Sequence, residues 1–181
     1  KPEDVEKIGN RFQMHPLLIE DVLNSTQKTK IEYFEEANQY LTILKVPRIN
    51  EDHDELELEQ VSLILGNNFL VSFQEFDNTN VFLPIIDRMH RENSKTRKHK
   101  ANYLLYALID LVVDNYYLVL GQIDEKINTL EGQILANAKS HHQNQLFFLK
   151  RSISVMRKSI FPLKEILNSI MRDSNPLIDG Q

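Results

Sequence analysis

The sequence predicts an α+β fold, in which helices cover a small β-sheet and a long antiparallel helical hairpin completes the chain. Apolar residues follow a strand-like alternation between residues 40 and 76, whereas after Val81 they recur with the period of a helix. Only 5 of the 181 residues are glycine, so few loops need a positive φ. With 41% hydrophobic and 26% charged residues, the composition is that of a globular protein.

Two short helical segments open the chain. The residues from Lys1 read as part of a helix, and Pro16 begins a second one, because its fixed φ and missing N–H cost least in a first turn. This second helix ends at Asn24. It presents Glu20 and Asp21 side by side.

Three segments have the composition of strands. Residues 40–49 are rich in β-branched and aromatic residues, and residues 56–65 alternate between apolar and polar. Residues 69–76 follow the turn signal Gly-Asn-Asn at 66–68. So small a sheet is not stable alone. We therefore expect helices to cover it and further strands to precede Lys1.

The helical hairpin is predicted beyond Val81. A segment of about three turns comes first and ends in the basic run 91–100, and a bend at residues 137–140 separates the two long helices. The apolar stripe of the first long helix is Leu105, Leu108, Val112, Tyr116, Val119, Ile123, Ile127, Leu130 and Ile134. That of the second is Leu146, Leu149, Ile153, Met156, Ile160, Leu163, Leu167 and Ile170. Pro162 lies within the second stripe, where we expect a kink.

Common catalytic signatures are absent from the sequence. There is no cysteine, which excludes disulfides, thiolate zinc sites and cysteine nucleophiles. There is also no Gly-x-Ser-x-Gly elbow, no phosphate-binding Gly-x-x-x-x-Gly-Lys loop and no dinucleotide fingerprint. We therefore do not expect an enzyme.

Charge and hydropathy narrow the partners. The net charge of −5 gives no general attraction to nucleic acid, so we expect none as a partner and favour cations. No stretch reaches the 18 or so uncharged apolar residues of a membrane span. The best candidate, Tyr103 to Val113, is short and carries Asp110. We expect these residues alone to form no pore.

Carboxylates on two helices are the candidate metal ligands. Glu20 and Asp21 lie on the short helix, and Asp110 and Asp114 lie one turn apart on the long helix. Hard divalent cations such as Mg²⁺ prefer oxygen ligands, often one or two carboxylates with the remaining waters kept. Spacing alone leaves a second interpretation open, in which these are ordinary solvated carboxylates of charged helices.

Other charged clusters are interpreted as surface. The acidic run at residues 51–59 is predicted to be a solvated connection, with Glu57 and Glu59 pointing out of the sheet. The basic residues between Arg88 and Lys100 lack interleaved aromatics and fit a solvated helix connection. The six histidines show no zinc-protease spacing.

Five segments, taken in order, carry a family resemblance. They are HPLLIED at 15–21, EQVSLIL at 59–65, FQE at 73–75, YLLYALID at 103–110, and RD with PLI at 172–178. Together they resemble the cytosolic domain of the CorA family of magnesium/cobalt transport proteins, from about residue 5 to residue 179. Several motifs in the right order are more specific than any one of them.

The resemblance implies an α/β/α sandwich around a mixed sheet. Residues 1–80 would be the C-terminal part of the α/β cytosolic domain, and residues 81–181 the long-helix layer leading toward a stalk and two membrane helices. The family assembles as a homopentamer in the inner membrane, with this part on the cytoplasmic side. Its Gly-Met-Asn signature would lie beyond these residues.

The resemblance also implies regulatory metal sites between neighbouring subunits. Asp21 would face an acidic stalk residue of the next subunit, and Glu20 and Asp110 would contribute to a second site. The implied cofactor is regulatory Mg²⁺, with Co²⁺ or another divalent cation as an alternative. Asp114 is a further candidate on spacing alone.

The sequence thus leads to an expected function with alternatives. We expect the cytosolic regulatory domain of a CorA-type channel for Mg²⁺, also Co²⁺ and Ni²⁺, whose intersubunit sites sense Mg²⁺ and control gating. The alternatives are a ZntB-like zinc transporter domain, a stand-alone helical interaction module and, more remotely, a metal-dependent hydrolase. Because most pentamer contacts would lie in the missing stalk and membrane helices, we expect these residues alone to be a monomer or weak dimer.

Overall fold

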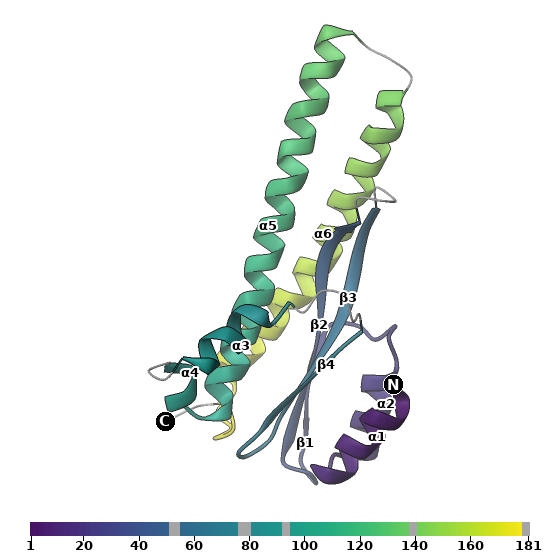
Figure 1. Ribbon diagram of the computed structural model, residues 1–181. Helices are drawn as coiled ribbons and strands as arrows, with labels where there is room; N and C mark the ends of the chain where they lie inside the picture. Colours follow the sequence, from purple (N-terminus) through teal and green to yellow (C-terminus); the bar gives the residue numbers. More distant parts are fainter. Residues whose placement is uncertain (51–54, 76–80, 92–94, 138–140, 179–181) are drawn as a thin grey trace.

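A four-stranded antiparallel sheet separates two layers of helices (Figure 1). The computed structural model describes residues 1–50, 55–75, 81–91, 95–137 and 141–178. The strands lie in the order β1 (Lys30–Phe34), β2 (Gln39–Asn50), β3 (Glu55–Leu65) and β4 (Leu70–Gln74). The long β2–β3 pairing runs from Tyr40 opposite Leu65 to Asn50 opposite Glu55.

Each face of the sheet is covered by its own helices. Helices α1 (Pro2–Arg11) and α2 (Pro16–Leu23) cover one face, with a core formed by Met14, Leu18, Leu41, Ile43 and Ile64. Helices α3 (Leu83–His90), α5 (Ala101–Ala136) and α6 (His141–Arg172) cover the other, where the larger core includes Leu44, Val46, Val61, Leu63, Leu105 and Met156. A four-residue helix, α4 (Lys95–Lys98), precedes α5. The predicted α/β/α sandwich is confirmed.

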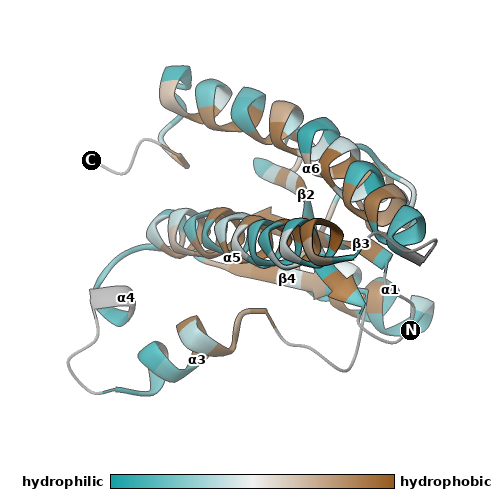
Figure 2. Cartoon of the chain, turned by 90° about the horizontal axis from the view of Figure 1, so that it is seen from above, coloured by the Kyte–Doolittle hydropathy of each residue, from teal (hydrophilic) through white to brown (hydrophobic). Residues whose placement is uncertain are grey.

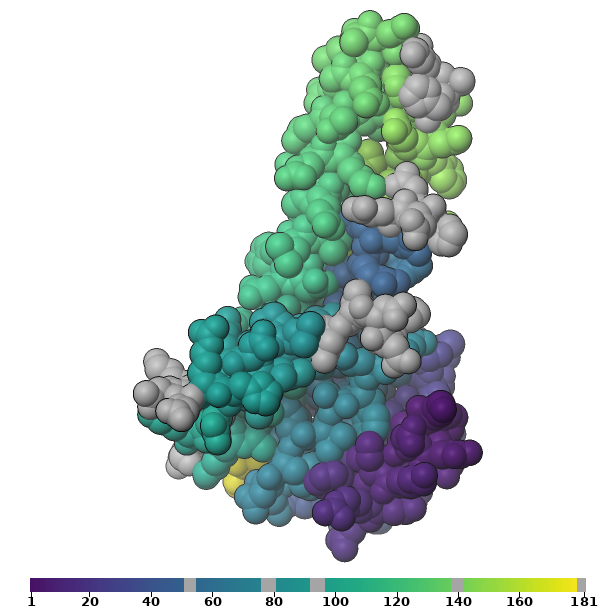
Figure 3. Space-filling view, in the orientation of Figure 1, coloured from purple at the N-terminus to yellow at the C-terminus, as the bar shows by residue number. Residues whose placement is uncertain are grey.

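The two long helices form the predicted antiparallel hairpin. They lie side by side and extend beyond the sheet as a narrow column (Figures 1 and 3). Hydrophilic and hydrophobic residues alternate around each of them (Figure 2). Helix α6 continues through Pro162 to Arg172, so the proline does not end the helix; the kink itself stays a prediction.

Only half of the predicted α6 stripe is buried. Leu149, Met156, Leu163 and Ile170, each seven residues apart, are in the core. Leu146, Ile153 and Ile160, which alternate with them, are exposed. Among the described residues α6 packs against α5 and against strands β1, β2 and β3, and the alternate residues of the stripe face away from these neighbours.

Two features of the sheet differ from what the sequence predicted. All pairings among the described strands are antiparallel, whereas a mixed sheet was expected. Strand β1 was not predicted, because it is a short, half-buried edge strand. Its turn into β2 has no glycine, since Asn38 takes the positive φ.

The prediction that Glu59 points into solvent is wrong. Its side chain is 2% exposed. The prediction assumed a sheet with one solvated face, but from Glu59 onward β3 is covered on both faces, so alternation no longer sets exposure. Glu57 is half-buried and pairs with Arg48. Glu55 is exposed, as predicted, and the acidic residues at 51–54 lie outside the described residues, as do 138–140 of the predicted bend.

Hydrogen bonds to main-chain carbonyls fix α5 on the sheet. The Tyr116 hydroxyl donates to the Lys45 carbonyl at 2.7 Å, and the Asn115 amide donates to the Pro47 carbonyl at 2.6 Å. Burial raises the pKa of Tyr116 to about 12. These contacts set which side of α5 faces the sheet and which side remains exposed.

Helix α5 also has the length and composition to cross a membrane, a candidate that the sequence was not expected to contain. A core helix of a globular fold passes the same test of length and composition, and 33% of the most apolar window of α5 is buried. Its inner face supplies much of the larger core. In this fold α5 is a core helix.

Two leucines of α5 test this packing. Leu105 is 0% exposed and Leu118 is 67% exposed. Leu105→Ala should lower the free energy of unfolding by about 2–5 kcal/mol, because it removes buried methyl groups and leaves a cavity. Leu118→Ala should change it by less than about 0.5 kcal/mol. Urea unfolding followed by circular dichroism measures both, and equal effects would contradict the assigned faces of α5.

Candidate metal site

Helix α2 holds Asp21 against the edge of the sheet. His15 caps the helix, its Nδ1 accepting a hydrogen bond from the Leu17 N–H at 3.3 Å. Leu18 is fully buried beneath the helix and anchors it to the sheet. Glu20 is exposed, whereas the Asp21 side chain is 17% exposed. The two neighbouring carboxylates therefore differ: Glu20 faces solvent, and Asp21 lies in the crevice between helix and sheet.

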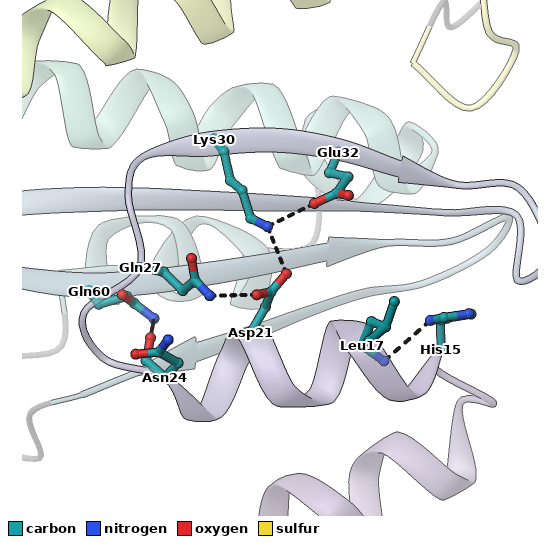
Figure 4. Close-up of polar contacts among 8 residues, drawn as sticks. All are labelled: His15, Leu17, Asp21, Asn24, Gln27, Lys30, Glu32 and Gln60. Atoms are coloured by element: carbon teal, nitrogen blue, oxygen red, sulfur yellow. Dashed lines mark hydrogen bonds and ion pairs between the residues drawn. The ribbon is translucent and has the colours of Figure 1, made fainter.

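Both carboxylate oxygens of Asp21 have partners within the chain (Figure 4). The Gln27 amide donates to Oδ1 at 2.5 Å, and the Lys30 ammonium donates to Oδ2 at 2.7 Å. Lys30 also reaches Glu32 Oε2 at 2.8 Å. Burial alone would lower the pKa of Lys30, but the hydrogen bonds and charges of Asp21 and Glu32 outweigh it and raise the pKa.

The loop between α2 and β1 is fixed to the sheet. Asn24 Oδ1 accepts hydrogen bonds from the Thr26 N–H at 3.1 Å and the Thr26 hydroxyl at 2.7 Å. The Gln60 amide donates to the Asn24 carbonyl at 2.9 Å, and the Lys45 ammonium donates to the Ser25 carbonyl at 3.0 Å. Asp21 and Lys30 are thus brought together by a connection held at several points.

Asp110 and Asp114 lie on the other side of the sheet. Both are exposed on α5, between the buried Ile109, Val112 and Tyr116. Because α2 and α5 cover opposite faces, Asp21 and Asp110 do not meet within one chain. Across the described ranges, no three His, Asp or Glu side chains are grouped closely enough to hold a metal ion.

The carboxylates present suit a hard, hydrated cation. Glu20, Asp21 and Asp110 offer oxygen donors without thiolate or imidazole, which is the donor chemistry of Mg²⁺. A chain offers these donors in two separate places: Glu20 with Asp21, and Asp110 with Asp114.

Three residues around Asp21 were missed by the sequence prediction. Gln27, Lys30 and Glu32 all follow α2, and the two charged residues lie on one side of β1, two positions apart. Their spacing is a usable signal only once β1 is known to be a strand. Because β1 was not predicted, the sequence could not show on which side of the strand Lys30 lies.

Comparison with known proteins shows which protein family the chain resembles. A family profile described as CorA-like Mg²⁺ transporter protein matches residues 1–181. The chain is 41% identical over 177 residues to the cobalt/magnesium transport protein CorA of Thermotoga maritima, which covers 98% of this chain and 50% of that protein. It is 20% identical over 183 residues to the CorA of Methanocaldococcus jannaschii, covering 98% and 54%.

A solved structure has the same fold. The soluble domain of CorA from Methanocaldococcus jannaschii matches with a TM-score of 0.82 at 17% identity, covering 98% of this chain and 69% of that one. The chain spans about half the length of the two curated relatives above.

Proposed function

The chain belongs to the CorA-like Mg²⁺ transporter family, and we propose that it is the cytosolic, metal-sensing part of a CorA-type channel that carries Mg²⁺ and Co²⁺ across the inner membrane. The observation that carries this proposal is the family match over all 181 residues. The name of the Thermotoga relative supports the choice of ions. The membrane segments and the cytoplasmic location belong to the same proposal, as does the homopentamer.

The separation of the carboxylates supports a site shared between copies. Glu20 of one copy would lie against Asp110 of the next, with Asp114 one turn away on α5, and Asp21 would face an acidic stalk residue of the neighbouring copy. Such carboxylates repel each other across the contact, and a divalent cation held there with part of its hydration shell would cancel the repulsion. Each chain holds α2 and α5 on opposite faces of its sheet. The carboxylates of α2 and those of α5 can therefore contact two different neighbouring copies at the same time.

A cation bound in this way acts on the assembly through differential affinity. Copies arranged so that these acidic residues meet bind the cation better than copies that have shifted apart, so binding favours the first arrangement. A fall in intracellular Mg²⁺ would restore the repulsion and let the copies shift. This is the proposed link between intracellular Mg²⁺ and gating, and it requires no catalytic step.

Limited proteolysis of the full-length protein tests the proposed ligands. Asp21→Asn and Asp110→Asn should each raise the Mg²⁺ concentration for half-maximal protection by roughly tenfold or more, because loss of a ligand costs at least as much as loss of an outer-shell partner. Asp124→Asn is the matched control, since Asp124 is exposed on α5 and touches only Asn128 among the contacts described. Protection that is unchanged in both ligand variants would contradict the proposal.

The identity of the ion is tested separately. Uptake of Mg²⁺, Co²⁺ and Zn²⁺ by vesicles containing the full-length protein should be fast for the first two ions. Uptake of Zn²⁺ alone would instead support a zinc transporter of the same superfamily.

The oligomeric state of residues 1–181 forms a further prediction. In dilute solution the fragment should be a monomer or weak dimer by light scattering, because the proposed ring depends on segments that follow Gln181. The full-length protein in detergent should be a pentamer. A stable pentamer of the fragment alone would show that these residues suffice for assembly and would contradict the prediction.

A further inference from the structure

Asp21 is paired with a lysine of its own chain. The Lys30 ammonium donates to Asp21 Oδ2 at 2.7 Å, while the neutral Gln27 amide occupies Oδ1. A cation that approaches Asp21 from a neighbouring copy therefore finds a positive charge already on one oxygen. Direct coordination through Oδ2 would have to displace Lys30, and binding through a bridging water would still be opposed by its charge.

Lys30 has a second carboxylate within reach on its own strand. Glu32 Oε2 lies 2.8 Å from the same ammonium, and the Glu32 side chain is 48% exposed. Residues two apart on a strand share one side, so this pairing does not depend on Asp21. If Lys30 leaves Asp21, it loses one ion pair and keeps the other.

The mobility needed for such an exchange is confined to the lysine side chain. Its main chain is held in the sheet, where Lys30 pairs with Ile43 of β2. The side chain is 31% exposed, and its four-carbon stem is flexible. The ammonium can therefore shift toward Glu32 while α2, β1 and the connecting loop stay in place.

We propose that Lys30 is a tethered counter-ion that competes with the divalent cation for Asp21 and so sets the Mg²⁺ concentration at which the site fills. This inference rests on the proposed function, in which Asp21 is a Mg²⁺ ligand. In the Mg²⁺-poor state Lys30 neutralises Asp21. In the Mg²⁺-bound state it pairs with Glu32 alone. Because an ion pair that is only partly buried contributes modestly, Lys30 raises the threshold several-fold without preventing binding.

The test uses the full-length protein and titrates Mg²⁺ at constant ionic strength, with protection from proteolysis as the readout. Lys30→Gln, which keeps a hydrogen-bond donor and removes the charge, should lower the half-maximal Mg²⁺ concentration about three- to tenfold. Lys28→Gln removes the same charge from an exposed position two residues away and should change it less than about twofold. Equal midpoints for these two variants would overturn the proposal.

Lys30→Arg provides a test in the opposite direction. Arginine keeps the charge and grips a carboxylate with two donors, so its midpoint should equal or exceed that of the unaltered protein. A midpoint lowered by Lys30→Arg would also overturn the proposal. Because this variant keeps the ion pair, it remains informative even if circular dichroism shows that Lys30→Gln fails to fold.

Asp21→Asn separates the two levels of the hypothesis. In the Asp21→Asn background, Lys30→Gln should no longer shift the midpoint, because the carboxylate for which Lys30 and the cation compete is gone. If Asp21→Asn alone leaves the midpoint unchanged, Asp21 is not a ligand, and its place in the proposed site fails together with the role of Lys30. If Asp21→Asn shifts the midpoint but Lys30→Gln does not, only the role of Lys30 fails.

Discussion

Burial of the sheet on both faces is the constraint on which the rest of this structure depends. Leu41 and Ile43 pack under α1 and α2, while Leu44 and Val46 pack under the long helices. Strands this apolar need cover on each side. The consequence is that acidic residues on α2 and on α5 are held on opposite sides of one chain, where they can meet only between copies.

The same architecture gives Asp21 a defined resting state. The loop after α2 is tied to β2 and β3 through Asn24 and Ser25, and it brings Lys30 to Asp21. Because Asp21 is held in position in this way, it needs little rearrangement to bind a cation. Its own counter-ion must nevertheless be displaced or opposed, so the local structure adjusts affinity as well as geometry.

Much of the fold could be predicted from hydrophobic periodicity. The long helices follow from apolar residues that recur with the helical period, and β2, β3 and β4 follow from the alternation of apolar and polar residues. Both patterns can be read without knowing the tertiary structure. Strand β1 was not predicted, because its residues are half-buried and show no clear alternation of apolar and polar side chains. The turn that follows it has no glycine, since Asn38 takes the positive φ. The Glu59 side chain was predicted to be exposed but is buried, because its exposure depends on which faces of the sheet helices cover. The covering of the sheet is a property of the whole fold.

The candidate ligands could be named from the sequence, but their partners could not. Glu20, Asp21 and Asp110 could be chosen from residue type, spacing and the family resemblance. That Asp21 and Asp110 lie on opposite faces of the sheet could be seen only once the position of the sheet was known. The most direct measurement of the central claim is anomalous diffraction from the full-length protein with Mn²⁺ in place of Mg²⁺. The account predicts one peak between Glu20 of one copy and Asp110 of its neighbour, and a second peak at Asp21 where the two copies meet. Density absent there, with Asp21 still paired to Lys30, would contradict it.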